Sequence, residues 1–307
     1  MPELPEVETI RRHLAPHVEG RTLSALRIDD ARWSRPLAPG ELIAAVEGRR
    51  VERLGRRGKY LVWELEDEVF LLVHLRMTGT LLLSGEAVPH TRVRFELDGG
   101  EQRLIFVDPR RFGTGELALG ADALEAFLAA RLGVEPFDPA FTVAHLRALA
   151  RRCRAPVKAF LLDQKRIAGV GNIYADEALH RAGIHPERRT DRLRPAQIAA
   201  LRDAVVAALE AGVAAKGATI DDFRHPDGVR GSFQDQFLVH TRAGAPCPAC
   251  GSAIRKLVVG GRGTYVCERC QPRPRGGNAT LARSGAGGPY AASPASLPSR
   301  SARASSV

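Results

Sequence analysis

The first residues of the chain place a proline directly before a glutamate, in Met1-Pro2-Glu3. Removal of Met1 would leave the secondary amine of Pro2 at the terminus, and an α-amino group titrates near about pH 8, so a useful fraction is unprotonated at neutral pH. Such an amine can attack a sugar C1′ or a carbonyl carbon and form a Schiff base. Glu3 could serve as general acid if its surroundings raise its pKa. Alone, however, the pair is more often a chance feature of a disordered terminus.

Four of the five cysteines form two pairs with two residues between the partners, and 16 residues separate the pairs. Two such pairs are the spacing of a tetrahedral zinc site, whereas a redox dithiol needs only one pair. The residues between them predict a β-hairpin, with strands at 254–259 and 263–266 and a glycine-rich tip that contains Arg262. A hairpin this short does not fold alone, so metal would close its base. The sequence therefore predicts one structural Zn²⁺ ion, held by Cys247, Cys250, Cys267 and Cys270.

Length and composition indicate a globular protein with room for two domains, since the chain has 307 residues and 44% hydrophobic content. It contains no apolar run near the roughly 20 residues of a membrane span. The acidic start, without an apolar stretch behind it, excludes a secretory signal, so we expect a cytoplasmic protein with no membrane partner. The net charge of +10 suggests a polyanionic partner, but residues 273–307 hold five arginines and no acidic residue. Because half of the excess lies there, the argument for nucleic acid depends on where the other charges sit.

The spacing of apolar residues divides the chain into a strand-rich part and a helical part. A short amphipathic helix carries Val7, Ile10 and Leu14, and the strand-like runs that follow predict an antiparallel sandwich or barrel. These runs are residues 50–54, 60–65, 69–75, 93–97 and 104–107. Beyond residue 120 the period is helical, with a helix at 121–132, one capped by Thr142, and one from Pro195 to about residue 217. Residues 137–141, which contain Pro139 and follow Pro136, are the predicted link.

These patterns predict an α+β protein of four parts. The predicted boundaries are an N-terminal β-sandwich domain at 1–136, a helical domain at 137–235, a zinc-finger hairpin at 236–270 and a disordered tail at 271–307. The tail is assigned no function, because its Gly, Ala, Ser, Pro and Arg composition cannot build a core.

Three further motifs carry groups that suit a nucleic acid. Gly169 and Gly171 permit close backbone approach and Asn172 would begin a helix whose first amides bind anions, although a lone GxG is weak evidence. The run 108–113 (DPRRFG) sets two guanidinium groups beside a phenyl ring, which suits phosphate contact and insertion between bases or, equally, a solvated surface turn. Met77, on a turn, is either an apolar wedge or a filler of core space.

Together the motifs resemble one family, the bacterial formamidopyrimidine-DNA glycosylases. The resemblance is carried by 2–9 (PELPEVET), 57–61 (RGKYL), 108–113 (DPRRFG), 169–174 (GVGNIY) and the four-cysteine hairpin, over about residues 1–270. It implies a two-domain fold in which the sandwich is catalytic and residues 142–190 form a helix-two-turn-helix element. It also implies a bifunctional DNA glycosylase and apurinic-site lyase of base excision repair. Such an enzyme removes oxidised purines, chiefly 8-oxoguanine opposite cytosine and formamidopyrimidines, from damaged double-stranded DNA.

The resemblance implies four catalytic residues. Pro2 would be the nucleophile that forms the Schiff base, and Glu3 the proton donor and acceptor on the sugar. Lys59 would donate a proton in β-elimination, although by itself it is an ordinary exposed hairpin lysine. Arg262 would act in δ-elimination and contact a phosphate, held in place by a finger that zinc stiffens. The product would be a one-nucleotide gap with phosphate at both ends.

A set of DNA contacts is implied as well, because extruding a base costs on the order of a few kcal/mol of stacking that wedge side chains partly recover. The wedges would be Met77, Arg110 and Phe112. His90 would contact the DNA, and Asn172 would bind a phosphate. Where a family lysine is expected, ungapped matching puts Cys153, so Arg152 or Arg154 would substitute for it. Residues 217–238, which include Phe223 and Gly228, match the family's lesion-recognition loop only loosely.

Two other functions stay open at this point. The nearest is an endonuclease VIII type enzyme, which prefers oxidised pyrimidines, although Leu4 in PELPE and the DPRRFG motif favour the purine enzyme. A noncatalytic zinc-finger DNA-binding protein is the other, and it would leave Pro2, Glu3 and Lys59 unexplained. For the glycosylase we expect a monomer that binds damaged duplex DNA and is associated with the nucleoid through that binding.

Overall fold

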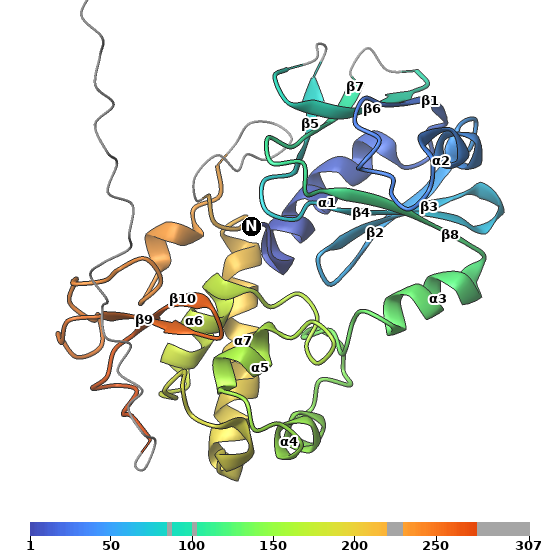
Figure 1. Cartoon of the computed structure of the whole chain (residues 1–307). Helices are drawn as coiled ribbons and strands as arrows, with labels where there is room; N and C mark the ends of the chain where they lie inside the picture. Colours follow the sequence, from blue (N-terminus) through green and yellow to red (C-terminus); the bar gives the residue numbers. More distant parts are fainter. Residues whose placement is uncertain (85–87, 100–102, 220–229, 275–307) are drawn as a thin grey trace, which may run out of the picture. The chain divides into compact units, whose positions relative to one another are not determined.

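The structure, a computed structural model, describes residues 1–84, 88–99, 103–219 and 230–274 (Figure 1). Met1–Pro274 form one compact unit. The predicted tail lies outside the described residues from residue 275 onward, and so do Phe223 and Gly228 of the predicted recognition loop. Within the described ranges, no helix is both long and apolar enough to cross a membrane.

Two four-stranded antiparallel sheets face each other across a shared core. One has the order β1 (Leu23–Ile28), β6 (Thr91–Leu97), β7 (Arg103–Val107), β5 (Thr80–Ser84), and the other β2 (Val51–Arg57), β3 (Tyr60–Leu65), β4 (Val69–His74), β8 (Thr114–Leu119). Alternation along the strands turns large apolar side chains inward. Trp63 of β3 stacks on Phe95 of β6, with ring centroids 5.3 Å apart. The predicted antiparallel sandwich is confirmed.

Three helices pack on the sandwich. Helix α1 (Leu4–Val18) buries Val7, Ile10 and Leu14 in the sandwich core, on the face that the apolar spacing predicted. Leu4, one turn earlier, is buried in the core of the helical part instead, so the first turn of α1 contacts both cores. Helix α3 (Ala121–Ala129) covers the outer face of the second sheet through Leu128. Helix α2 (Pro39–Val46) buries its apolar side against the sandwich core.

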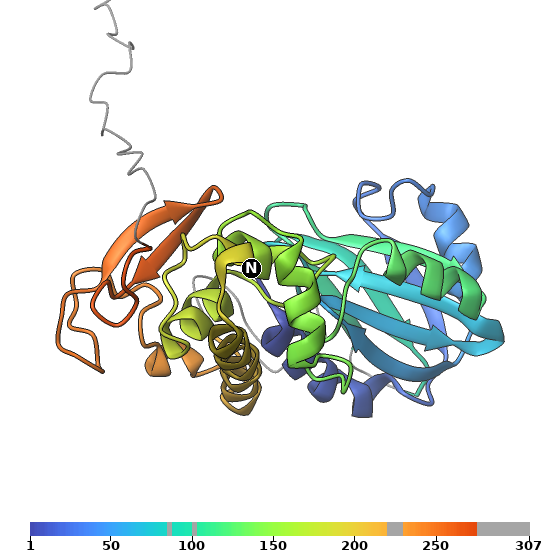
Figure 2. The ribbon, with the colours of Figure 1, turned by 90° about the horizontal axis from the view of Figure 1, so that it is seen from below.

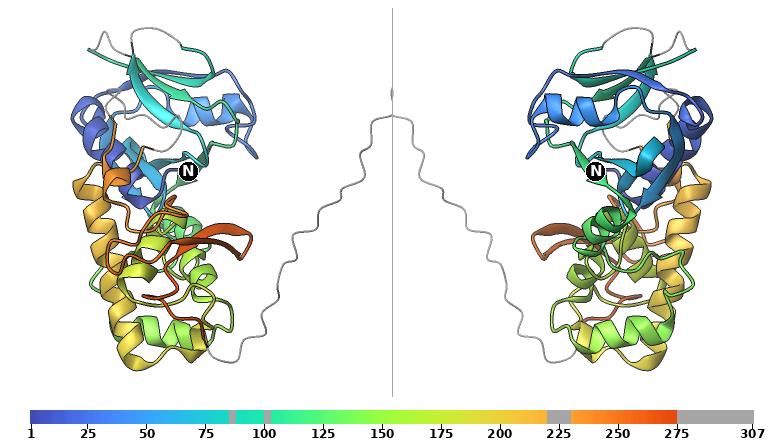
Figure 3. Two further views of the ribbon diagram at one scale, coloured as in Figure 1. Left: turned by 90° about the vertical axis from the view of Figure 1, so that its left-hand side faces the viewer. Right: turned by 90° about the vertical axis from the view of Figure 1, so that its right-hand side faces the viewer.

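The helical part contains α4 (Val143–Arg151), α5 (Val157–Leu162), α6 (Asn172–Arg181) and α7 (Pro195–Ala214), which Figure 3 shows from two sides. The predicted cap of α4 is confirmed, because Thr142 Oγ1 accepts the N–H of His145 at 3.1 Å. Pro195 occupies the first turn of α7, as its fixed φ suggested. Phe141 is fully buried in the helical core, so the predicted link at 137–141 ends inside a packed region.

The zinc hairpin consists of β9 (Arg255–Val259) and β10 (Arg262–Val266) and lies beside α6 (Figure 2). Gly260 and Gly261 form the tip with φ of 58° and 73°, values that suit a two-residue turn between twisted strands. Arg262 pairs with Val259 and begins β10, which corrects its predicted place in the tip. The apolar cluster at the base of the hairpin contains four buried residues within the described part of the chain, two of them cysteines, which is too few to stabilise this region alone.

Several short elements escaped the sequence patterns. Strands β1, β5 and β8 and helix α2 were not individually predicted, and the helix expected at 121–132 ends at Ala129. Single 3₁₀ turns lie at Glu66–Glu68, Thr190–Arg192 and Phe233–Gln236. Phe233, which the resemblance placed in the recognition loop, is fully buried and stacks on Tyr174 at 5.1 Å.

Candidate active site

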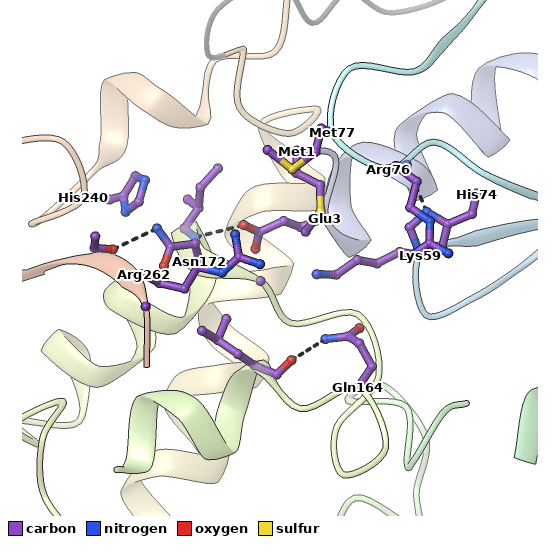
Figure 4. A pocket seen from close by; sticks show the side chains of 15 residues that line it. Met1, Glu3, Lys59, His74, Arg76, Met77, Gln164, Asn172, His240 and Arg262 are labelled. Atoms are coloured by element: carbon purple, nitrogen blue, oxygen red, sulfur yellow. Dashed lines mark hydrogen bonds between the residues drawn. The ribbon is translucent and has the colours of Figure 1, made fainter. Parts of the chain in front are cut away.

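A cavity of about 570 Å³ lies between the start of α1, the β2–β3 turn and the zinc hairpin. Glu3, Lys59 and Arg262 line it, and Figure 4 shows their side chains converging from these three elements. Met1 also lines the cavity and is 45% exposed, while Pro2 is buried between Met1 and Glu3. The structure thus brings Glu3, Lys59 and Arg262 to one cavity, while buried Pro2 adjoins Glu3 in the chain but is not among the lining residues.

Glu3 is held by the N-terminus of α6. Its side chain is buried, with Oε1 accepting the N–H of Ile173 at 2.9 Å and Oε2 that of Tyr174 at 3.4 Å. First-turn amides have no partner inside the helix, and the helix dipole favours negative charge there. Gly171 leaves the necessary space, because a Cβ at this position would stand 2.2 Å from Cδ of Glu3. The GVGN motif therefore binds an anion, and that anion is the chain's own carboxylate.

A second buried carboxylate, Glu6, holds the backbone of the same turn. It accepts the N–H of Glu3 at 2.8 Å, the N–H of Ala218 at 2.7 Å and the hydroxyl of Tyr174 at 2.7 Å. Burial raises the pKa of Glu6 above its ordinary value, and the neighbouring Glu3 raises it further. The hydrogen bonds of Glu6 therefore fix the N-terminal segment, residues 2–6, in addition to those of Glu3.

Lys59 follows Gly58 in the β2–β3 turn and is 5% exposed. Burial lowers its pKa, because desolvation disfavours the ammonium, and Glu3 and Glu6 act in the opposite direction. The resulting amine gives up a proton more readily than an exposed lysine does. Lys59 is therefore a buried lysine that lines the cavity rather than an exposed hairpin lysine.

The turn that carries Lys59 is fixed from the segment between α3 and α4. Glu135 accepts a hydrogen bond from the backbone N–H of Gly58 and forms an ion pair with Arg56 at 3.0 Å. Arg56 also reaches Glu8 of α1 at 3.3 Å, and its side chain is only 10% exposed. This network ties the turn both to α1 and to the start of the helical part.

Arg262 reaches the cavity because α5 and α6 hold the residue after it. The carbonyl oxygen of Gly263 accepts Nζ of Lys158 at 2.9 Å and Nδ2 of Asn172 at 3.0 Å. Lys158 is fully buried and pairs with Asp176 of α6 at 2.7 Å. Burial lowers the pKa of Lys158, and Asp176 counters that effect.

The four predicted metal ligands form one cluster, with all Sγ atoms within 4.8 Å of one another. The Cys247–Cys270 and Cys250–Cys267 sulfur distances are 3.9 Å and 3.4 Å, close to the about 3.8 Å of a tetrahedron with Zn–S bonds of about 2.3 Å. The N–H of Ser252 lowers the pKa of Cys250 to about 6, whereas burial and the other cysteines raise that of Cys270 to about 12. Thiols this close compete for protons, and Zn²⁺ resolves the competition by binding four thiolates. The set fits one structural zinc ion.

Three family models match successive parts of the chain: the formamidopyrimidine-DNA glycosylase N-terminal domain at residues 1–115, the H2TH domain of the same enzymes at 132–224, and the zinc finger found in FPG and IleRS at 244–273. The chain is 46% identical over 276 residues to the formamidopyrimidine-DNA glycosylase of Chloroflexus aggregans, which covers 88% of this chain and 98% of that one. The chain belongs to the formamidopyrimidine-DNA glycosylase family.

Solved structures of the family share the fold. The MutM (Fpg) protein of Thermus thermophilus superposes with a TM-score of 0.80 at 44% identity, over 88% of this chain and 98% of that one. The Lactococcus lactis Fpg mutant G226P, solved with DNA containing Fapy-dG, gives a TM-score of 0.83 at 34% identity, over 89% and 100%. Both matches extend across the sandwich, the helical part and the hairpin.

Several residues of this family member line the cavity without having been predicted as site residues, among them His74, Arg76, Gln164 and His240. Burial lowers the pKa of His74 to about 3, and its Nδ1 accepts the N–H of Arg76 at 3.0 Å, so the ring is neutral. The only sequence signal was the HLRMTG run, from which Met77 alone was taken as a site residue. Met77 does line the cavity, as Figure 4 shows.

The predicted wedge residues Arg110 and Phe112 lie outside the cavity lining, on the loop after β7. The guanidinium of Arg110 is 4.8 Å from the ring centroid of Phe112, which is 49% exposed. Buried Asp108 shapes this loop by accepting the N–H groups of Phe112 and Gly113 at 2.8 Å each. The carbonyl of His90 accepts the N–H of Asp108 at 3.0 Å, so His90 lies beside the same loop.

The remaining predicted contacts are in the helical part. Arg152 and Arg154 are exposed at the end of α4 and are not among the residues lining the cavity, while Cys153 between them is buried. Asn172 lines the cavity, yet its amide nitrogen is used on Gly263, and its buried Oδ1 has no partner among the described residues. Their roles in binding DNA stay predictions.

Proposed function

We propose that this chain is a bifunctional DNA glycosylase and apurinic-site lyase of base excision repair, which removes 8-oxoguanine and formamidopyrimidines from damaged double-stranded DNA. The observation that carries the proposal is the convergence of Glu3, Lys59 and Arg262 on one cavity beside Pro2. Membership of the family supplies the class of reaction, and the Lactococcus lactis relative was solved with DNA that contains Fapy-dG. The enzyme acts as a monomer, in the cytoplasm and on the nucleoid.

The glycosylase step needs Met1 to be removed, which frees the Pro2 nitrogen. That nitrogen attacks C1′, the bond from C1′ to the base breaks, and the base leaves with its electron pair and takes up a proton. The Pro2 nitrogen passes its proton to the Glu3 carboxylate, and Glu3 then protonates the sugar ring oxygen as the ring opens, which leaves an iminium between C1′ and Pro2. The buried position of Glu3 against the α6 amides holds its carboxyl group beside Pro2.

The lyase steps use the other two residues. Lys59, whose pKa burial lowers, donates a proton during β-elimination of the 3′ phosphate. Arg262 contacts a phosphate and assists δ-elimination of the 5′ phosphate, which leaves a one-nucleotide gap with phosphate at both ends. Zinc takes no part in the chemistry; bound by the four cysteines, it holds the hairpin that presents Arg262.

DNA is bound by residues on both parts of the protein. Met77, Arg110 and Phe112 fill the space that the extruded base leaves, and the exposed stack of Arg110 on Phe112 supports this role. Asn172 binds a phosphate, and His90, Arg152 and Arg154 also contact the DNA. We keep the domain division proposed from the sequence: 1–136, 137–235, 236–270 and 271–307.

Covalent trapping tests the nucleophile. Borohydride reduces an iminium to a stable amine, so the protein should become linked to a duplex that contains 8-oxoguanine opposite cytosine, and peptide mass spectrometry should place the link on Pro2. The Pro2→Gly variant should trap much less. Undiminished trapping by Pro2→Gly would sink the mechanism. Intact mass measurement shows in the same preparation whether Met1 has been removed.

Substrate comparison tests the rest of the proposal. Excision from an 8-oxoguanine duplex should exceed excision from a thymine glycol duplex; the reverse order would indicate the endonuclease VIII type. Binding without any nicked product would indicate a noncatalytic zinc-finger protein. Arg262→Ala should weaken DNA binding and cleavage, whereas Arg255→Ala, at the base of the same hairpin, should change neither.

A further inference from the structure

The zinc-finger segment, residues 247–271, packs against one face of α6. Asn172, Asp176 and His180 are spaced by four residues and therefore share that face. Nδ2 of Asn172 donates to Gly263, Oδ2 of Asp176 accepts the N–H of Tyr265 at 3.4 Å, and Nε2 of His180 lies 3.3 Å from Sγ of Cys247. The first two contacts hold the hairpin strand, but the third reaches a metal ligand directly.

His180 is positioned for one interaction only. The residue is 8% exposed in the last turn of α6, and its Nδ1 is buried with no hydrogen-bond partner in the part of the chain that the structure describes. Its Nε2 is within the range of an N–H···S hydrogen bond to Cys247. A zinc-bound thiolate has no proton to donate, so the ring must donate from Nε2.

This hydrogen bond would stabilise the negative charge of the thiolate cluster. Four thiolates around one Zn²⁺ carry a net charge of −2 in a poorly solvated place, and N–H groups directed at the sulfurs reduce that cost. His180 provides a side-chain donor for Cys247 from outside the zinc-finger segment.

We propose that His180 is a positioning residue of the zinc centre, which donates a hydrogen bond from Nε2 to the Cys247 thiolate, tightens zinc binding and fastens the zinc-finger segment to the C-terminal end of α6. The helix has ten residues and a length of about 15 Å, and its other end binds Glu3 and Gly263. Through His180, the same helix connects the zinc site with Glu3 and, by way of the Gly263 carbonyl, with Arg262 in the cavity.

Zinc affinity of the full chain without DNA tests the proposal independently of any glycosylase activity. In competition with a chromogenic chelator, His180→Phe should bind zinc about 10-fold to 100-fold more weakly than the unaltered protein. His180→Gln places an amide N–H at about the reach of the imidazole Nε2, on a more flexible side chain, and should recover part of the loss. His185→Phe is the matched control, because His185 is also buried but accepts the N–H of Glu187 and has no hydrogen bond to a cysteine among the described residues.

Two spectroscopic measurements separate a hydrogen bond from general packing. With Co²⁺ in place of zinc, loss of the bond in His180→Phe should move the thiolate-to-cobalt charge-transfer band to lower energy, because the sulfur lone pairs are no longer stabilised. Nitrogen NMR of the unaltered zinc-loaded protein should show the proton of His180 on Nε2, and this holds even if a variant fails to fold. Equal zinc affinity with an unchanged cobalt spectrum, or a proton on Nδ1, would overturn the proposal.

Discussion

The N-terminal segment (residues 2–6) and the zinc hairpin (residues 255–266) each bring one charged side chain to the same cavity, yet they are held by different forces. In the N-terminal segment every residue is buried, and Glu3 and Glu6 together accept five hydrogen bonds from backbone or tyrosine donors. In the hairpin most residues are exposed or half-buried, and Val258 is 72% exposed. Burial fixes the first region, whereas metal and a few polar contacts fix the second.

Helix α6 is the element that the two regions share. Its first-turn amides bind Glu3, and Asn172 in the same turn binds Gly263 beside Arg262. The two regions can therefore lie next to each other in the cavity while depending on different interactions. Perturbations that act on one force should disturb one region and spare the other, which makes the comparison testable.

Removal of zinc should give the largest difference between the two regions. Structural zinc contributes about 10 kcal/mol or more to a small metal-bound module, so a strong chelator should unfold the hairpin. Affinity for duplex DNA, measured by fluorescence anisotropy, should fall and should return when zinc is restored. Both tryptophans, Trp33 and Trp63, are buried in the sandwich core, so their emission should stay unchanged. A simultaneous change in tryptophan emission would show that the regions are not independent.

Lys158→Met should produce the next largest effect. It leaves Asp176 as a buried charge without its lysine partner, a loss that typically lowers the free energy of unfolding by about 3 to 5 kcal/mol. Urea unfolding measures this loss, and adding Asp176→Asn should recover part of it. The control is Lys165→Met, since Lys165 is exposed in the same part of the chain. Equal destabilisation by the two lysine substitutions would show that the buried Lys158–Asp176 pair does not hold the hairpin in place.

Gly171→Ala should disturb the N-terminal segment alone. The added Cβ would stand 2.2 Å from Cδ of Glu3, so the carboxylate must move. Displacement of a catalytic group by about 1 Å costs on the order of 100-fold in rate, which single-turnover excision of 8-oxoguanine would measure. Zinc content should not change. Gly40→Ala serves as the control because a Cβ at Gly40 meets nothing within 4 Å. Full activity in Gly171→Ala would mean that Glu3 does not need this position.

Local patterns predicted the elements whose signals lie in neighbouring residues. The burial of Val7, Ile10 and Leu14 follows from their helical spacing, and the zinc cluster follows from the spacing of the cysteines. Strand β8 was missed because Gly115 interrupts its pattern, and the structure shows why glycine is there: a Cβ would stand 2.1 Å from Trp33. That contact joins residues far apart in the chain, so no local window contains it.

The site shows the same limit. The residues of the cavity come from distant segments, and only the resemblance to a family predicted that Glu3, Lys59 and Arg262 meet. Sequence reasoning identified the anion-binding end of α6 but not its ligand, because the Glu3 carboxylate comes from the other end of the chain. His74 gave no separate signal, since an alternating strand that ends in histidine is common and its neutral state depends on burial.

The smallest expected effect concerns the response of the N-terminal segment to pH. The folded pKa of Glu6 is raised above its ordinary value of 4.5, so between that value and the raised pKa the folded state binds more protons than the unfolded state. Stability should therefore fall as pH rises through this window, by at most about 1.4 kcal/mol per pH unit for one group. Urea unfolding over the window measures the slope, and Glu6→Gln, which cannot titrate, should remove this component at the cost of one acceptor. Glu52→Gln, at an exposed position, should leave the slope as it is. If the slope persists in Glu6→Gln, the burial of this carboxyl group does not cause the pH dependence of stability. The N-terminal segment would then differ from the metal-dependent hairpin in its packing alone.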